Sequence, residues 1–119
     1  MLSQAFGQDV RLKTAEEYRL VFQNRKSSHG RYFSVHGMTN TLDRPKLGLA
    51  VSKKVSKKAV ERNRIKRQIR ESFRMKQQEL AAINYVVVAK PAAAGISGND
   101  LLVDLKQLWV KTRNKCERS

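Results

Sequence analysis

Acidic residues are scarce in this sequence: 10 Asp and Glu stand against 25 Lys and Arg, so the formal net charge is +15. A charge of this size destabilises a compact chain by self-repulsion unless a counter-charge offsets it. The imbalance argues against an enzyme for neutral substrates. It favours a polyanionic partner, and the usual ones are nucleic acid and an anionic membrane surface.

Long hydrophobic runs and cysteines are scarce as well. No run of about 18 apolar residues occurs, so we expect no membrane-spanning helix. The opening residues MLSQAFGQDVRLK lack the charged start and the apolar stretch of a secretory signal peptide. Cys116 is the only cysteine, which excludes an intrachain disulfide and makes the reducing cytoplasm the simplest expectation. A nucleophilic role for Cys116 is disfavoured, because it would need a placed base.

The length and the apolar pattern predict one α+β domain over residues 1–119, with a small sheet packed by helices. The stretch TAEEYRLVF predicts the first helix, since Thr14 and Glu17 form a capping box. Tyr18, Val21 and Phe22 fall on one face of that helix. Apolar patterns predict strands at residues 31–38, 46–52 and 84–90, and a further short strand in KSSHG or near the N-terminus.

Two more helices complete the predicted order of helix, two strands with an optional third, helix, strand, helix. A basic helix is predicted over about 57–80 with Ser56 as its N-cap, and the last helix starts at Ser97 or Asn99. The strands on either side of the basic helix are predicted to pair in parallel, because a crossover helix connects parallel strands. The tail after about residue 112 is predicted to be frayed.

The segment KKAVERNRIKRQIRESFR has two different sides when it is drawn as a helix of about 100° per residue. Ile65, Ile69 and Phe73 share one arc, which predicts the core face. Within residues 53–74, ten basic residues stand against two acidic ones, unlike the mixed signs of an ordinary solvated helix. Arg62 points along the core face, where we expect it to clamp a phosphate at the border of the sheet. A second stripe follows at i, i+3, i+4, i+7 and i+11: Asn63, Lys66, Arg67, Arg70 and Arg74.

Nucleic acid is the favoured polyanion. A membrane-surface helix needs an exposed apolar face, whereas here the apolar face is needed for the core. Arginine outnumbers lysine in residues 62–74, and its forked guanidinium suits phosphate. No zinc-finger spacing, heptad repeat or clear helix-turn-helix indicates DNA. Tyr18, Phe22 and His36 are suited to stacking on single-stranded RNA, and the alternative that Tyr18 and Phe22 are core residues stays open here.

The stretch VSKKVSKKAVERNRIKRQIRESFR resembles the signature of the protein component of bacterial ribonuclease P. The mark of that family is an Arg-Asn-Arg triplet in a basic helix, preceded by a lysine-rich turn after a strand. Here the triplet is Arg62-Asn63-Arg64. RLKTAEEYRLVF and NYVVVAKPA also resemble the family, so the likeness covers most of the chain, while the C-terminal third is generic.

The resemblance implies a left-handed β-α-β crossover around the basic helix, a rare handedness. It also implies a function, because the family protein binds a catalytic RNA, and together they remove the 5′ leader of precursor tRNA. Magnesium ions are expected on that RNA, and the protein is expected to raise substrate and metal affinity. No catalytic residue and no tightly bound metal are expected in the protein, and neither a membrane nor an obligate protein partner is implied.

The resemblance assigns two sets of site residues. For contacts to the single-stranded leader it implies Tyr18, Phe22 and His36, the last at a strand position that can be aromatic in the family. For contacts to the catalytic RNA it implies Lys53, Lys54, Lys57, Arg62, Asn63, Arg64, Lys66, Arg67 and Arg70.

Two other functions are compatible with parts of the sequence. A ribosomal or other structural RNA-binding protein has the same composition and differs only in lacking the triplet helix. A protein that cleaves RNA by itself is disfavoured, because His29 and His36 are the only histidines and no convincing metal-hydrolase cluster is present. If about six phosphates are neutralised, the log–log salt slope of RNA affinity is expected to be about −4 to −5.

Overall fold

The computed structural model describes residues 10–117 of the chain. The short strand predicted in KSSHG is present, whereas a strand before Val10 and the signal-peptide interpretation concern residues outside the described part. None of the described helices is long and apolar enough to cross a bilayer. The elements follow in the order α1 (Ala15–Gln23), β1 (Lys26–His29), β2 (Phe33–Thr39), β3 (Lys46–Ala50), α2 (Ala59–Lys76), β4 (Ile83–Ala89) and α3 (Gly98–Glu117).

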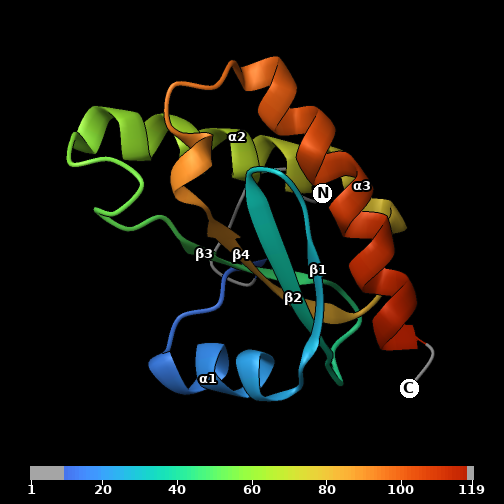
Figure 1. The fold of residues 1–119 in the computed structure, drawn as a ribbon. Helices are drawn as coiled ribbons and strands as arrows, with labels where there is room; N and C mark the ends of the chain where they lie inside the picture. Colours follow the sequence, from blue (N-terminus) through green and yellow to red (C-terminus); the bar gives the residue numbers. More distant parts are fainter. Residues whose placement is uncertain (1–9, 118–119) are drawn as a thin grey trace.

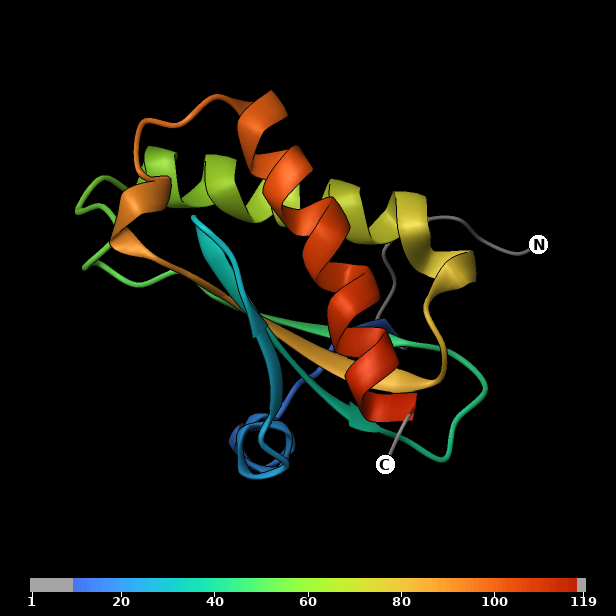
Figure 2. The same ribbon diagram turned by 45° about the vertical axis from the view of Figure 1, so that its right-hand side comes forward.

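The four strands form one sheet in the order β1-β2-β4-β3. β2 runs antiparallel to β1 and β4, and β3 runs parallel to β4, which confirms the predicted pairing across the basic helix. Helix α1 covers one face of the sheet, and α2 and α3 cover the other (Figures 1 and 2). The left-handed sense of the β3-α2-β4 crossover stays a prediction from the resemblance.

The main core lies between the sheet and the pair α2 and α3. Alternation along β2 and β4 turns Phe33, Val35 and Tyr85 toward these helices. Ile65, Ile69 and Phe73 are fully buried, which confirms the predicted core face of the basic helix. The two helices are also joined by a buried hydrogen bond: Trp109 Nε1 donates to Ser72 Oγ at 2.8 Å.

The predicted bounds of the basic helix are wrong at both ends. It begins at Ala59 and ends at Lys76, and a 3-10 turn follows at Gln77–Glu79. Ser56 is not its N-cap, because its Oγ accepts from the backbone N–H of Lys58 at 3.2 Å in a turn before the helix. At the last helix Ser97 is the cap rather than Asn99, since the Asp100 N–H donates to Ser97 Oγ at 3.2 Å.

The prediction of a frayed tail after about residue 112 is also wrong, because α3 continues to Glu117. Thr112 is buried and its Oγ1 donates to the backbone carbonyl of Val35 at 3.2 Å. Cys116, one turn later, is 3% exposed. The last residues look polar in sequence because only Thr112 and Cys116 of that stretch face the sheet, at the helical spacing of four.

Candidate nucleic-acid interface

An open groove of about 980 Å³ runs along α1. The capping box predicted at Thr14 and Glu17 is formed and fixes the start of the helix. Val21 is fully buried against Val86 and holds α1 to the sheet. The side chains that line the groove are therefore those beside this anchor: Ala15, Tyr18, Arg19, Phe22, Gln23 and Arg25.

Tyr18 is a lining residue of the groove that is fixed in place. Its hydroxyl oxygen accepts from the backbone N–H of Leu49 at 3.1 Å. Its ring lies directly over Gly48, where an added Cβ would be 2.7 Å from the ring atom Cζ. The question left open by the sequence is thus answered differently for the two aromatics, because Tyr18 is half-buried while Phe22 is 41% exposed.

Phe22 and His36 are brought together from α1 and β2. Their ring centroids are 4.9 Å apart in an edge-on arrangement, and His36 Nε2 lies 3.1 Å from Ser34 Oγ. His29 lies on β1, with its ring centroid 6.1 Å from that of His36. Burial, and then the neighbouring His29, lower the pKa of His36 below its usual 6.5. A neutral imidazole at pH 7 is able both to stack and to accept a hydrogen bond.

The lysine-rich loop before α2 presents its cations on the outside. Lys53, Lys54 and Lys57 are exposed, and Val55 between them is buried and anchors the loop to the core. Arg62 Nη1 donates to the carbonyls of Ser56 at 3.0 Å and Lys57 at 3.1 Å. In this structure Arg62, which we expected to clamp a phosphate, fastens the loop to the helix.

Arg64 is likewise engaged within the protein. Its guanidinium donates to the carboxylate of Glu61 through Nε at 2.9 Å and Nη2 at 2.7 Å. Glu61 Oε2 also accepts from the backbone N–H of Gly95 at 2.9 Å, which ties α2 to the loop before α3. These hydrogen bonds, with the one from Arg64 the largest, lower the pKa of Glu61 from 4.5 to about 2.

The remaining part of the α2 stripe is not paired. The side chains of Lys66, Arg67 and Arg70 have no hydrogen bond or ion pair to any residue within 10–117, and Asn63 beside them is exposed. Arg74, at the end of the stripe, differs because its Nε donates to Glu71 at 3.3 Å. We call Asn63, Lys66, Arg67 and Arg70 the open stripe.

The open stripe and the α1 groove meet at Tyr18. Lys66 and Arg70 line a smaller cavity together with Tyr18, which also lines the groove. The structure therefore joins two sets of residues that lie far apart in the sequence. It also adds Arg11 and Arg25, which sequence reasoning missed because neither lies on a predicted helix face.

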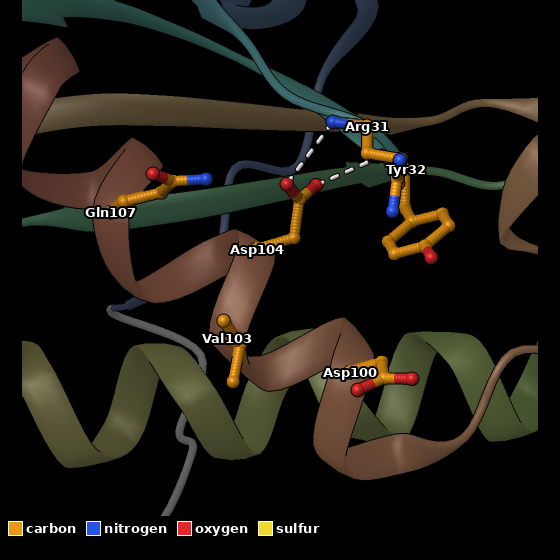
Figure 3. Close-up of a pocket in the computed structure, with 6 residues that line it drawn as sticks. All are labelled: Arg31, Tyr32, Asp100, Val103, Asp104 and Gln107. Carbon is orange, nitrogen blue, oxygen red and sulfur yellow. Dashed lines mark hydrogen bonds between the residues drawn. The ribbon is translucent and has the colours of Figure 1, made fainter.

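A third hollow, of about 390 Å³, lies on the side of α3 and has a structural explanation. Figure 3 shows the Asp104 carboxylate accepting from the backbone of Arg31 and Tyr32, at 3.1 and 2.9 Å. A third N–H, that of Phe33, donates at 3.2 Å. Gly30 is required beside it, because a Cβ there would lie 2.5 Å from Asp104 Oδ1. This carboxylate anchors the β1–β2 turn to α3.

Metal ligands are few in the part of the chain that is described. Residues 10–117 contain no group of three or more His, Cys, Asp and Glu side chains placed to hold a metal ion. Asn63 offers an amide oxygen, but Lys66 and Arg67 share its helix face. Such a neutral donor among cations is a poor cation ligand unless phosphates neutralise its surroundings.

Comparisons with known proteins agree with this arrangement. The family model described as Ribonuclease P matches residues 6–113. The ribonuclease P protein component of Vibrio cholerae is 44% identical over 109 residues, which cover 92% of each chain. That of Escherichia coli O157:H7 is 41% identical over 109 residues, again covering 92% of each chain.

Solved structures show the same fold. The RNase P protein from Staphylococcus aureus has a TM-score of 0.79 at 30% identity, covering 83% of this chain and 91% of its own. The RNase P protein from Thermotoga maritima has a TM-score of 0.75 at 28% identity, covering 83% and 94%. The chain therefore belongs to the ribonuclease P family, as a protein component of that ribonucleoprotein endoribonuclease.

Proposed function

We propose that this chain is the RNA-binding, non-catalytic subunit of ribonuclease P and assists a catalytic RNA in removing the 5′ leader of precursor tRNA. The observation that carries this proposal is that Tyr18 lines both the α1 groove and the cavity bordered by Lys66 and Arg70 of the open stripe. A groove with exposed aromatic surface suits an unpaired strand, and a row of unpaired cations suits a phosphate backbone. One subunit thus holds leader and catalytic RNA side by side.

Two sets of residues divide the binding. Phe22 and His36 offer ring surface to leader bases, and Tyr18 lines the groove beside them. Arg62 and Arg64 act from within the protein, by fixing the lysine loop and the Gly95 loop against α2. The side chains that reach the catalytic RNA are Lys53, Lys54, Lys57, Asn63, Lys66, Arg67 and Arg70.

Magnesium ions are held mainly by the RNA in this proposal. Bound magnesium stabilises the charge that develops as the phosphodiester is cleaved. The protein contributes by drawing RNA phosphates together along the open stripe, which makes the amide oxygen of Asn63 usable beside an RNA-held ion. Removing that amide with Asn63→Ala would then raise the magnesium concentration required for cleavage.

The proposed cellular location follows from these RNA partners. We infer that the chain works in the cytoplasm on catalytic RNA and precursor tRNA, without a membrane and without an obligate protein partner. A ribosomal or other structural RNA-binding role is not favoured by the comparisons.

Reconstitution tests the proposal. Precursor tRNA and the matching catalytic RNA are incubated at low magnesium with and without the protein. We expect stimulated cleavage at the leader junction, no cleavage by the protein alone, and less stimulation by Arg70→Ala. General RNA binding without stimulation would overturn the proposal, and cleavage by the RNA-free protein would assign the chemistry to the protein.

A further inference from the structure

The hollow of about 390 Å³ on the side of α3 is built from two segments. Arg31 and Tyr32 enter it from the β1–β2 turn, and its other lining residues belong to α3 (Figure 3). The α3 residues are spaced at i, i+3, i+4 and i+7, so they share one face of the helix. They are Asp100, Val103, Asp104 and Gln107. Because α1 and α3 cover opposite faces of the sheet, this hollow is separate from the α1 groove (Figures 1 and 2).

Asp100 is an exception among the acidic residues. Its carboxylate has no hydrogen bond or ion pair to any residue within 10–117, although 25 Lys and Arg stand against 10 Asp and Glu in the chain. Every other acidic side chain in that range has a hydrogen bond or an ion pair. Asp104, in the same hollow, is occupied by three backbone N–H groups. Asp104 therefore builds the hollow, whereas the two oxygens of Asp100 are open to a ligand.

The other side chains at the hollow are open as well. Those of Arg31 and Gln107 are exposed and make no hydrogen bond or ion pair inside the described range 10–117. Tyr32 is half-buried against the main core, and Val103 is 62% exposed. Proteins bind an unpaired base by stacking it on an aromatic ring and by hydrogen bonds along its pairing edge. The hollow offers both, since a ring and an apolar side chain lie beside separate acceptor and donor groups.

The charge of the protein decides between two kinds of ligand. A cationic ligand would pair with Asp100, but a chain with a net charge of +15 repels it. The same charge attracts a nucleotide, and the guanidinium of Arg31 at the hollow suits a phosphate. The base must then satisfy Asp100 with N–H groups, because an ionised carboxylate only accepts hydrogen bonds.

The base that meets this requirement best is guanine. Its pairing edge carries two adjacent donors, N1–H and N2–H, which match the two oxygens of one carboxylate. Adenine, cytosine and uracil each place an acceptor next to their donor on that edge, and the acceptor would face the carboxylate. Guanine O6 lies beside N1–H and needs a donor, which the amide of Gln107 supplies from the same face of α3.

We propose that this hollow binds one unpaired guanosine nucleotide. Tyr32 stacks on the base, Asp100 accepts from N1–H and N2–H, and Gln107 donates to O6. Arg31 binds the phosphate. Free guanosine monophosphate and an unpaired guanosine within an RNA strand offer this same chemistry. The inference goes beyond the proposed function, because the hollow is separate from the α1 groove and its ligand requires no catalytic RNA.

The test compares guanosine, inosine and adenosine monophosphates, each titrated into the full-length protein at about 0.2 M salt, where non-specific phosphate binding is weak. Inosine monophosphate differs from guanosine monophosphate only in lacking the 2-amino group. We expect guanosine monophosphate to bind about tenfold more tightly than the other two, the scale of a hydrogen bond to a charged group. The NMR signals of the Tyr32 and Val103 backbone amides are expected to shift on binding. This comparison needs no variant.

Variants then assign the preference to its residue. Asp100→Asn is expected to reduce the preference for guanosine over inosine monophosphate to less than about twofold, because an amide donates where the carboxylate accepts. Arg31→Gln is expected to weaken all three nucleotides alike. Asp43→Asn is the matched control, since it removes the same charge from an exposed turn outside the hollow. A preference that survives Asp100→Asn, or that Asp43→Asn abolishes equally, would overturn the assignment.

Two RNA pentamers, UUGUU and UUAUU, distinguish the source of the guanosine. Tighter binding of UUGUU than of UUAUU assigns the hollow to an unpaired guanosine of an RNA strand. A preference seen with the mononucleotides alone assigns it to a free nucleotide. Equal affinities in both comparisons would sink the proposal. Stimulated cleavage in the reconstituted system would be untouched by that result, so the proposed function stands or falls separately.

Discussion

The arginines of α2 differ in whether their guanidinium groups are already bonded within the protein. Arg62 is held by two backbone carbonyls and Arg64 by Glu61, while Arg67 has no partner within residues 10–117. An arginine whose donors are already satisfied loses those bonds when it turns to RNA, whereas an unpaired one does not. The RNA-binding capacity of each residue is thus set by the acceptors within its reach.

Phe22 gives a prediction at this scale. Phe22→Ala removes an exposed ring beside His36, and base–aromatic stacking is worth about 1–3 kcal/mol. We expect the affinity of the holoenzyme for leader-bearing precursor tRNA to fall at least about fivefold, with affinity for leaderless tRNA unchanged. Leu20→Ala is the control, because Leu20 is 37% exposed on the same helix but does not line the groove. An equal loss for both variants would contradict leader stacking on Phe22.

At the scale of secondary-structure elements, the loop before α2 is held in place by Arg62, a side chain of the helix that follows it. Arg62→Ala removes two hydrogen bonds from the carbonyls of Ser56 and Lys57, each worth about 1 kcal/mol. We expect trypsin to cleave the free protein at the lysines within residues 53–58 about tenfold faster than in the wild type. The reason is that the loop opens more often when Arg62 no longer holds it. Mass spectrometry of the early fragments measures this. Arg67→Ala is the control, and an unchanged cleavage rate in Arg62→Ala would mean that Arg62 does not hold the loop.

The contact between α2 and the Gly95 loop gives a pH-dependent prediction. The pKa of Glu61 is about 2 when folded, against 4.5 ordinarily, so its stabilisation is complete above pH 4.5 and is lost as the pH falls toward 2. The ion pair is partly exposed and screened, so we expect Glu61→Gln to lower the free energy of unfolding by about 1 kcal/mol at pH 7. Urea unfolding at steps from pH 7 to pH 3 measures the difference.

That difference is expected to narrow below pH 4.5, because the unfolded chain then takes up a proton on Glu61 while the folded protein still holds it as a carboxylate. Glu79→Gln is the control, since it breaks only an exposed pair with Lys76, 3.2 Å apart, and is expected to change the free energy less. A constant difference across the pH range would contradict the role of the Glu61 carboxylate.

Over the whole molecule, three of the acidic residues join or cap elements of the fold. Glu17 caps α1, Glu61 joins α2 to the Gly95 loop, and Asp104 joins the β1–β2 turn to α3. None of them pairs with a cation of the lysine loop or the open stripe, where the basic side chains stay available to a partner. The net charge of +15 is concentrated where RNA is proposed to bind rather than spread evenly.

This distribution predicts how salt acts on RNA binding. If about six phosphates are neutralised, the log–log slope of affinity against salt is about −4 to −5. Arg67→Gln removes an unpaired cation and is expected to make the slope shallower by about 0.7–0.9. Arg74→Gln is expected to change it less, because Arg74 is already paired with Glu71. Equal changes for the two variants would show that pairing does not decide which cations meet phosphate.

The sequence alone determined the features that depend on spacing along one element. Capping chemistry fixed the start of α1, the period of α2 separated Ile65 and Ile69 from the cations, and the β-branched run at 84–90 gave the central strand β4. These follow from local physics, because side-chain direction in a helix or strand is set by position. The family resemblance rests on the same local stretch.

Only the tertiary structure decided which groups meet. Glu61 reaches Gly95 across 34 residues, Arg11 shares a cavity with Lys66, and Thr112 binds Val35 across 77 residues. Spacing tells where a side chain points from its own helix, but not which distant acceptor lies there. The arginines already bonded within the protein, the continuous helical end of α3 and the cavity shared by Arg11 and Lys66 could therefore not be predicted, because each depends on chain segments brought together by packing.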